Sequence, residues 1–222
     1  MSDRPLFEWD WIADHTDEIV ERLNQHVELT VLSILIGLAI AFPLALYAYR
    51  HRRFYGPLVS VTGVLYTIPS LALFAFLVPY TGLSTTTAEV GLVSYTLLIL
   101  IRNIVVGLDG VSEDVREAAR GMGYSARQLL WRVELPIAVP VIITGIRIAT
   151  VTTIGLVTVT ALIGQGGMGH FILLGLRTFN NTAALLGATV SIALAVVADV
   201  LLLGIQRLLT PWARALSARA IG

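Results

Sequence analysis

Five long apolar stretches alternate with short polar segments along the chain. They span residues 27–49, 57–80, 88–108, 136–163 and 182–206. Each is long enough to cross a membrane, because about 20 helical residues span a hydrocarbon core of about 30 Å. Within the second stretch, Pro69 lacks a backbone donor, so the run from Thr67 to Ser70 is expected to bend or break the helix. The pattern predicts an all-α, polytopic membrane protein with about five transmembrane helices.

Composition supports this interpretation and excludes several kinds of chemistry. Of the 222 residues, 56% are hydrophobic and 14% are charged, and the mean hydropathy is +0.80. Soluble domains carry about 25% charged residues. The chain has no Cys, which excludes disulfides and thiolate metal sites, and its four scattered His show no metal-ligand spacing. It also has no Lys, which a P-loop needs, so ATP hydrolysis must occur on a partner.

Residues 1–26 form an acidic N-terminal segment. Ile12, Ile19, Leu23 and Val27 recur at helical spacing within and just after it. We expect an amphipathic helix that lies on the membrane surface. A partly ordered tail is the alternative.

The arginines are distributed unevenly between the two sides that five spans define. Three segments on one side hold ten of the 15: Arg50, Arg52, Arg53, Arg116, Arg120, Arg127, Arg132, Arg207, Arg214 and Arg219. The positive-inside rule places this side in the cytoplasm. The expected organisation is therefore an extracytoplasmic segment (1–26), a transmembrane domain (27–207) with a cytoplasmic loop (109–135), and a cytoplasmic tail (208–222).

The cytoplasmic loop predicts two short helices. Ser112 and Ser125 are suited to cap them, and Gly123 can end the first in a left-handed conformation. The first helix carries one narrow apolar face, formed by Val115, Ala118, Ala119 and Met122.

Small residues on that face allow another protein to approach closely. Ala118 and Ala119 would fit a groove on a partner, with polar contacts at the rim from Glu117, Arg116 and Arg120. A solvated connector with ordinary caps explains the same pattern, so these residues alone leave both interpretations open.

The loop resembles the EAA loop of ABC importer permeases, the inner-membrane components of binding-protein-dependent transport systems. It carries Glu117-Ala118-Ala119, then Gly123, Val133 and Leu135-Pro136 at the spacing of that signature, with Val133 in place of Ile. The resemblance implies that the loop is a coupling helix that docks on a separate ATP-binding subunit. It also implies that ATP and Mg are held by that partner, and that this chain is not an enzyme and binds no cofactor or metal.

Further segments are similar to permeases for osmoprotectants such as glycine betaine, choline, carnitine and proline betaine. These segments are 67–73, 100–107, 145–147 and 161–169. The resemblance implies the methionine-importer-like permease fold, a second permease copy, an extracytoplasmic binding protein and a place in the bacterial cell membrane, with no nucleic-acid partner. Methionine importer permeases share the loop, so a methionine or other amino-acid importer is the alternative.

The glycine-rich run 164–169 could suggest a phosphate cradle, but no strand precedes it and no Lys follows it. We expect instead a turn near the outer face that serves packing or gating. Tyr66 could contact a quaternary ammonium group through its ring. The candidates for the translocation path or gate are Tyr66, Pro69, Ser70, Gly164, Gly166, Gly167 and Gly169.

Three ionisable residues lie at membrane depth, where a charge is costly unless it is paired or hydrated. Arg102, Arg147 and Asp199 lie about 9, 16 and 12 Å from the cytoplasmic ends of their spans at about 1.5 Å per residue. These depths predict that Asp199 pairs with Arg147 or Arg102, in a structural rather than a substrate-binding role.

Two other functions would need features that the sequence does not show. An ion-coupled secondary transporter predicts internal repeats and a midplane ion site. An intramembrane enzyme needs a converging nucleophile, base or metal set. No repeat and no such set are visible in the sequence.

Overall fold

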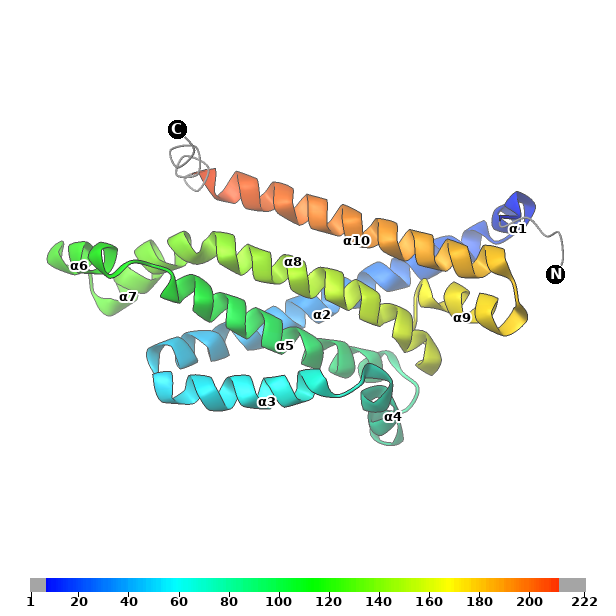
Figure 1. Ribbon diagram of the computed structural model, residues 1–222, viewed down its shortest axis with the longest axis horizontal. Coiled ribbons are helices and arrows are strands. Elements are labelled where there is room, and N and C mark those ends of the chain that lie inside the picture. The colour runs from blue at the N-terminus through cyan, green and yellow to red at the C-terminus, as the bar shows by residue number, and fades with distance from the viewer. Residues whose placement is uncertain (1–6, 212–222) are drawn as a thin grey trace.

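The computed structural model describes residues 7–211, whose regular structure is entirely helical (Figure 1). Four helical stretches are long and apolar enough to cross a membrane: α2 (Thr16–Arg50), α5 (Thr85–Asp109), the continuous stretch Ala126–Ile163, and α10 (Asn181–Leu209). A bent pair, α3 (Tyr55–Thr67) and α4 (Ser70–Thr81), can supply a fifth span. The predicted all-α fold with about five spans is confirmed.

The N-terminal part of the first span differs from expectation. A short helix, α1 (Trp9–Asp14), is followed by α2, which runs without interruption from Thr16 through the apolar stretch to Arg50. The prediction of a separate surface helix over residues 12–27 is therefore wrong. No Gly or Pro interrupts this segment, and a continuous helix avoids the unpaired backbone groups of an extra pair of helix ends.

The second span is broken where the sequence predicts. After a 3₁₀ turn, η1 (Arg52–Phe54), α3 ends at Thr67 and α4 begins at Ser70, with a bend of 93° between them. Ile68 and Pro69 have extended ψ angles of 127° and 131°. The Tyr95 hydroxyl of α5 donates to the carbonyl of Ile68, which has lost its helical partner at the break.

The loop after α5 forms the predicted helical hairpin: α6 (Glu113–Gly121), then α7 (Ala126–Leu129). Gly123 has a φ of +84°, and Ser125 forms a capping box with Gln128. Ser112 occupies the N-cap position of α6, but its side chain makes no capping hydrogen bond.

Pro136 lies in the first turn of the next apolar helix, as expected, but no break in the chain precedes that helix. A π-helical turn, η2 (Leu130–Glu134), joins α7 to α8 (Leu135–Val159) without a break. The Leu135 N–H donates to the carbonyl of Leu130, five residues back. Because Pro136 has no N–H, this wider turn lets the helix continue past a position where an α-helical bond is missing.

The glycine-rich connector contains a helix that the sequence pattern did not predict. After the 3₁₀ turn η3 (Thr160–Ile163) and the left-handed Gly164, α9 covers Gly169–Thr178. Phe179 is left-handed, with a φ of +56°, and reverses the chain into α10, whose first turn is capped by Asn180.

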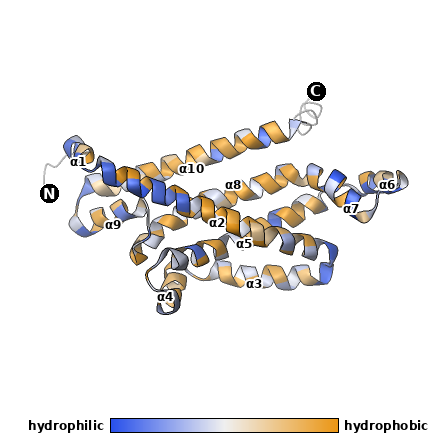
Figure 2. Ribbon diagram, turned by 180° about the vertical axis from the view of Figure 1, so that it is seen from behind, coloured by the Kyte–Doolittle hydropathy of each residue, from blue (hydrophilic) through white to orange (hydrophobic). Residues whose placement is uncertain are grey.

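The long helices run side by side, and the short ones gather at the two ends (Figure 1). The hairpin of α6 and α7 projects at one end, where α10 also finishes, whereas α1 and α9 lie at the other. Hydrophilic positions concentrate in the first turns of α2 and near the start of α3 (Figure 2). Of the four long helical stretches, α5 is the most enclosed: 56% of its most apolar segment is buried, compared with 6% for α10. The α10 helix is therefore peripheral.

Small residues allow the central helices to approach closely. Ala41, Ala45 and Ala48 of α2 are fully buried. A Cβ at Gly37 of α2 would overlap Thr96 of α5, and one at Gly145 of α8 would overlap Asn103 of α5. Packing through such residues is the usual means of association between helices in lipid.

Candidate functional site

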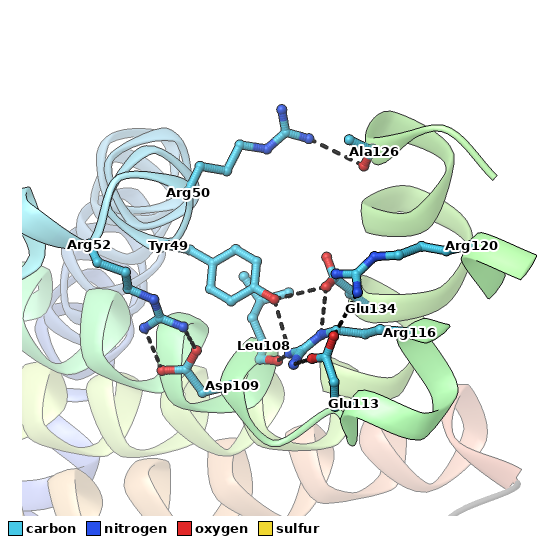
Figure 3. A network of polar contacts seen from close by, with 10 residues as sticks. All are labelled: Tyr49, Arg50, Arg52, Leu108, Asp109, Glu113, Arg116, Arg120, Ala126 and Glu134. Atoms are coloured by element: carbon cyan, nitrogen blue, oxygen red, sulfur yellow. Dashed lines mark hydrogen bonds and ion pairs between the residues drawn. The ribbon is translucent and has the colours of Figure 1, made fainter. Parts of the chain in front are cut away.

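The projecting hairpin is attached to the bundle through Arg116 of α6 (Figure 3). Its Nε donates to Oε1 of Glu134 at 2.9 Å, and its Nη2 donates to the Leu108 carbonyl at 2.9 Å and to the Tyr49 hydroxyl at 3.0 Å. Tyr49 in turn donates to the same Glu134 oxygen at 2.8 Å. One guanidinium thus connects α6 to the ends of α2 and α5 and to the π turn before α8.

This network is largely enclosed by protein. The side chain of Arg116 is 15% exposed and that of Glu134 is 7% exposed. The expectation that Arg116 forms a polar contact at the rim of a partner's groove is therefore wrong. The cause is orientation, since the face of α6 that carries Arg116 is turned toward the bundle.

Glu113 in the first turn of α6 connects two arginines of the same helix. It accepts from Nη1 of Arg116 at 3.0 Å and from Nη1 of Arg120 at 2.7 Å. The hydrogen bonds from Arg116 and then Arg120 lower the pKa of Glu113 below its usual value of 4.5. Arg120 is exposed and remains accessible to a partner despite this pair.

The outer side of α6 presents apolar and acidic groups together. Ala119 is buried, so the expectation that it fits a partner's groove is wrong: its side of α6 packs on the bundle. Glu117 and Ala118 are exposed, and Met122 is 69% exposed. Val115 is exposed on the same helix. We call Val115, Glu117, Ala118 and Met122 the docking face, after the role that the sequence predicts for this helix. Leu135 is buried and Pro136 half-buried, so both support the hairpin from within.

The basic loop after α2 lies against the same hairpin (Figure 3). Arg52 forms a bidentate ion pair with Asp109 at the end of α5, and Arg50 donates to the Ala126 carbonyl at 3.4 Å. A cavity of about 450 Å³, lined by charged residues together with Ala126 and Leu129, lies between this loop and the hairpin. Arg50, the last residue of α2, therefore gives this helix a second contact with the hairpin, and Arg52 connects the loop to α5.

The path candidates of the second span lie at its break. Tyr66 is exposed, and its ring meets that of Tyr95 edge-on, with centroids 5.9 Å apart. Pro69 is exposed and Ser70 is half-buried. These three residues remain candidates for the translocation path.

The glycines of the connector serve mainly close packing. Gly164 is exposed, but Gly166, Gly167 and Gly169 are buried. Gly167 has a φ of +48°, and a Cβ there would come within 2.6 Å of His26. These three enclosed glycines support a packing turn, one of the two roles expected for this run.

His26, which the sequence did not single out, holds the connector in place. Its Nδ1 accepts from the Met168 N–H at 3.3 Å, while Nε2 lies 3.1 Å from the Ile154 carbonyl. The two contacts fit a neutral ring that accepts at Nδ1 and donates at Nε2. The ring joins α2, α8 and the connector.

The predicted ion pair at membrane depth is confirmed for Arg147. Its Nε and Nη2 donate to the two carboxylate oxygens of Asp199, each at 2.9 Å, and its Nη1 donates to Gln206 at 3.3 Å. The pair links α8 to the peripheral α10. Arg102 does not take part: it is exposed on α5 and makes no polar contact within the described chain.

Comparison with known proteins identifies the family to which this chain is similar. Residues 33–215 match the family described as "Binding-protein-dependent transport system inner membrane component". The similar region begins within α2 and includes the whole hairpin and the other long helices. Among residues 7–211 there is no group of three or more His, Asp or Glu that could hold a metal.

Curated relatives match almost the full chain. The choline transport system permease protein OpuBB of Bacillus subtilis is 33% identical over 194 residues, which are 87% of this chain and 89% of that protein. The carnitine transport permease protein OpuCB of Listeria monocytogenes is 36% identical, over 84% and 86% of the two chains. The osmoprotectant import permease protein OsmW of Salmonella typhimurium is 34% identical, over 90% and 96%.

Solved structures share the fold at lower identity. An inward-facing form of the MetNI methionine ABC transporter superposes with a TM-score of 0.81 over 95% of this chain and 100% of that chain, at 20% identity. An amino-acid ABC transporter crystallised with histidines has a TM-score of 0.75 over 90% and 98%, at 18% identity. The methionine-importer-like fold is confirmed, and the secondary-transporter and enzyme alternatives are not retained. The chain belongs to the binding-protein-dependent transport system inner membrane components and is the permease subunit of an ABC importer in the cell membrane.

Proposed function

We propose that α6 is the coupling helix of this permease: it binds a separate ATPase and transmits the conformational change of that ATPase to the transmembrane helices. The docking face lies on a helix that projects beyond the bundle, and its Ala118 and Met122 would enter a groove on the ATP-binding subunit. Glu117 and Arg120 would meet polar groups at the rim of that groove. ATP and Mg would be bound by the ATPase.

The attachment of α6 supports a mechanical role for it. Arg116 donates hydrogen bonds simultaneously to Tyr49 of α2, to the Leu108 carbonyl of α5 and to Glu134 before α8. A displacement of α6 would therefore move the ends of three long helices together. In a pair of permeases this would switch the path between outward- and inward-facing forms.

The arrangement of charge supports an orientation in the membrane. The loop after α2, the hairpin and the end of α10 gather at one end of the molecule and carry most of the arginines (Figure 1). We place this end in the cytoplasm and the end with α1 and α9 outside. A binding protein would deliver the substrate to the outer end.

The proposed substrate is an osmoprotectant with a quaternary ammonium group, such as glycine betaine, choline, carnitine or proline betaine. The observation that carries this proposal is the 33–36% identity to choline, carnitine and osmoprotectant permeases over at least 84% of the chain. The methionine and amino-acid transporters share the fold at 18–20% identity, which supports no common substrate.

Uptake by the assembled transporter tests the substrate class. The permease would be reconstituted in proteoliposomes with the ATPase and binding protein of its host. We expect ATP-dependent uptake of labelled glycine betaine or choline that excess methionine does not inhibit. Uptake of methionine alone would replace the osmoprotectant assignment with the amino-acid alternative.

A further inference from the structure

The exposed residues of the central helix α5 follow one ridge. Thr86, Val90, Arg102 and Val106 are exposed, and the half-buried Ser94 and Leu98 fill the intervening positions at every fourth residue. Polar side chains alternate with apolar ones along this ridge, at Thr86, Ser94 and Arg102. Except near its ends, the rest of α5 is covered by α2, α3, α4 and α8.

The outer half of this ridge borders a groove between α2 and α5 of about 540 Å³. Apolar side chains supply most of its lining, and Thr86, Glu89, Val90 and Ser94 line it on the α5 side. Glu89 is only 8% exposed: one carboxylate oxygen accepts from Ser33 at 2.7 Å, and the other has no hydrogen-bond partner among the described residues. A carboxylate on the floor of a groove indicates a surface that does not face lipid.

Arg102 continues the ridge beyond the groove. It lies seven residues before Asp109, about 10 Å from the end of α5 at about 1.5 Å per residue. It cannot use Asp199, which is paired with Arg147 across α8 and α10. An exposed guanidinium at this depth needs water or an anionic partner.

We propose that Arg102 lines the translocation path and binds the carboxylate of a zwitterionic substrate. This inference rests on the proposed substrate class. A quaternary ammonium carboxylate such as glycine betaine offers no hydrogen-bond donor, so its carboxylate is the group that a fixed guanidinium can hold in two-point contact. Choline has a hydroxyl in place of the carboxylate and makes no such ion pair. Arg102 thus discriminates between the two kinds of osmoprotectant.

Transport by Arg102→Gln measures this discrimination. In proteoliposomes with the complete transporter, we expect the KM for glycine betaine to rise about tenfold, as loss of a charge-assisted hydrogen bond implies, with choline changed less than about threefold. Equal losses for both solutes would overturn the role of Arg102 and leave the proposed function intact. A native transporter that moves neither solute would overturn the proposed function and this inference with it.

Thiol labelling tests the position of Arg102 without a second solute. Because the chain has no Cys, Arg102→Cys, Ser94→Cys and Val196→Cys each introduce a single thiol. Val196, 57% exposed on the peripheral α10, is the lipid-facing control. We expect a membrane-impermeant thiol reagent to modify positions 94 and 102 but not 196, and glycine betaine under turnover to slow modification at 102. An unreactive thiol at position 102, or modification there that the solute leaves unchanged, would overturn the proposal.

Discussion

Arg116 of α6 donates to Glu134 of the π turn at 2.9 Å, and both side chains are largely withdrawn from solvent although 18 residues separate them. This bond closes the hairpin at its base. It also makes Arg116 part of the bundle rather than of the docking face. The hairpin is therefore attached where its two ends leave the long helices.

Removal of Arg116 should loosen the hairpin. Arg116→Ala leaves Glu134 buried without its cation, and loss of one member of a buried pair typically costs about 3–5 kcal/mol. We expect a lower Tm in detergent and faster amide exchange in α6, with membrane insertion unchanged. Arg127→Ala, on the exposed surface of α7, is the matched control and should leave both measurements unchanged.

The Glu113 carboxylate should make the order of α6 depend on pH. Hydrogen bonds from Arg116 and Arg120 lower the pKa of Glu113 in the folded state. Its contribution is therefore fully present above the usual carboxyl pKa and is lost as the pH falls through the lowered pKa. The protection factors of the α6 amides, which correct for the intrinsic pH dependence of amide exchange, should stay constant from pH 7 to about 5 and decrease below the usual carboxyl range. Glu113→Gln should remove this acid-dependent change; a variant with the native pH profile would contradict the assignment.

The Arg147–Asp199 pair should attach α10 to the bundle. Each single change, Arg147→Gln or Asp199→Asn, leaves one charge at membrane depth without its partner and should lower the Tm. The double variant removes both charges and should recover most of the lost stability. Tm values of the four proteins would give the coupling between the two residues. Additive losses would show that the pair does not act as a unit.

The connector should be intolerant of a side chain at Gly167. Gly167→Ala places a Cβ against His26 and requires a left-handed φ. We expect a lower Tm and reduced transport. Gly155→Ala is the control, because Gly155 lies within α8 with open space around it, and alanine there should stabilise the helix by up to about 1 kcal/mol. Equal behaviour of the two variants would contradict the packing role.

Local sequence rules predicted those features whose cause is local. The break before Ser70 follows from Pro69, and the second helix of the hairpin follows from the cap that Ser125 provides. The Arg147–Asp199 pair was predictable because a charge at membrane depth needs a partner, and helical rise placed the two at similar depths.

The remaining features depend on contacts between distant residues. The sequence could not show which side of α6 faces the bundle, so it placed Arg116 at the rim. Tyr49 gave no signal because its partners, Arg116 and Glu134, lie 67 and 85 residues away. The glycines before and at the start of α9 suggested a flexible loop and so concealed the helix, whereas Gly167 and Gly169 allow close contacts with His26 and Thr158.

Co-purification with the ATP-binding subunit tests the central claim most directly. The native permease would be compared with Glu117→Arg, which reverses a charge on the docking face, and with Glu21→Arg, which makes the same change at an exposed position near the N-terminal end of α2. We predict that the native protein and Glu21→Arg retain the ATPase, whereas Glu117→Arg inserts normally and loses it. Retention of the ATPase by Glu117→Arg, or its absence from the native protein, would contradict docking through α6.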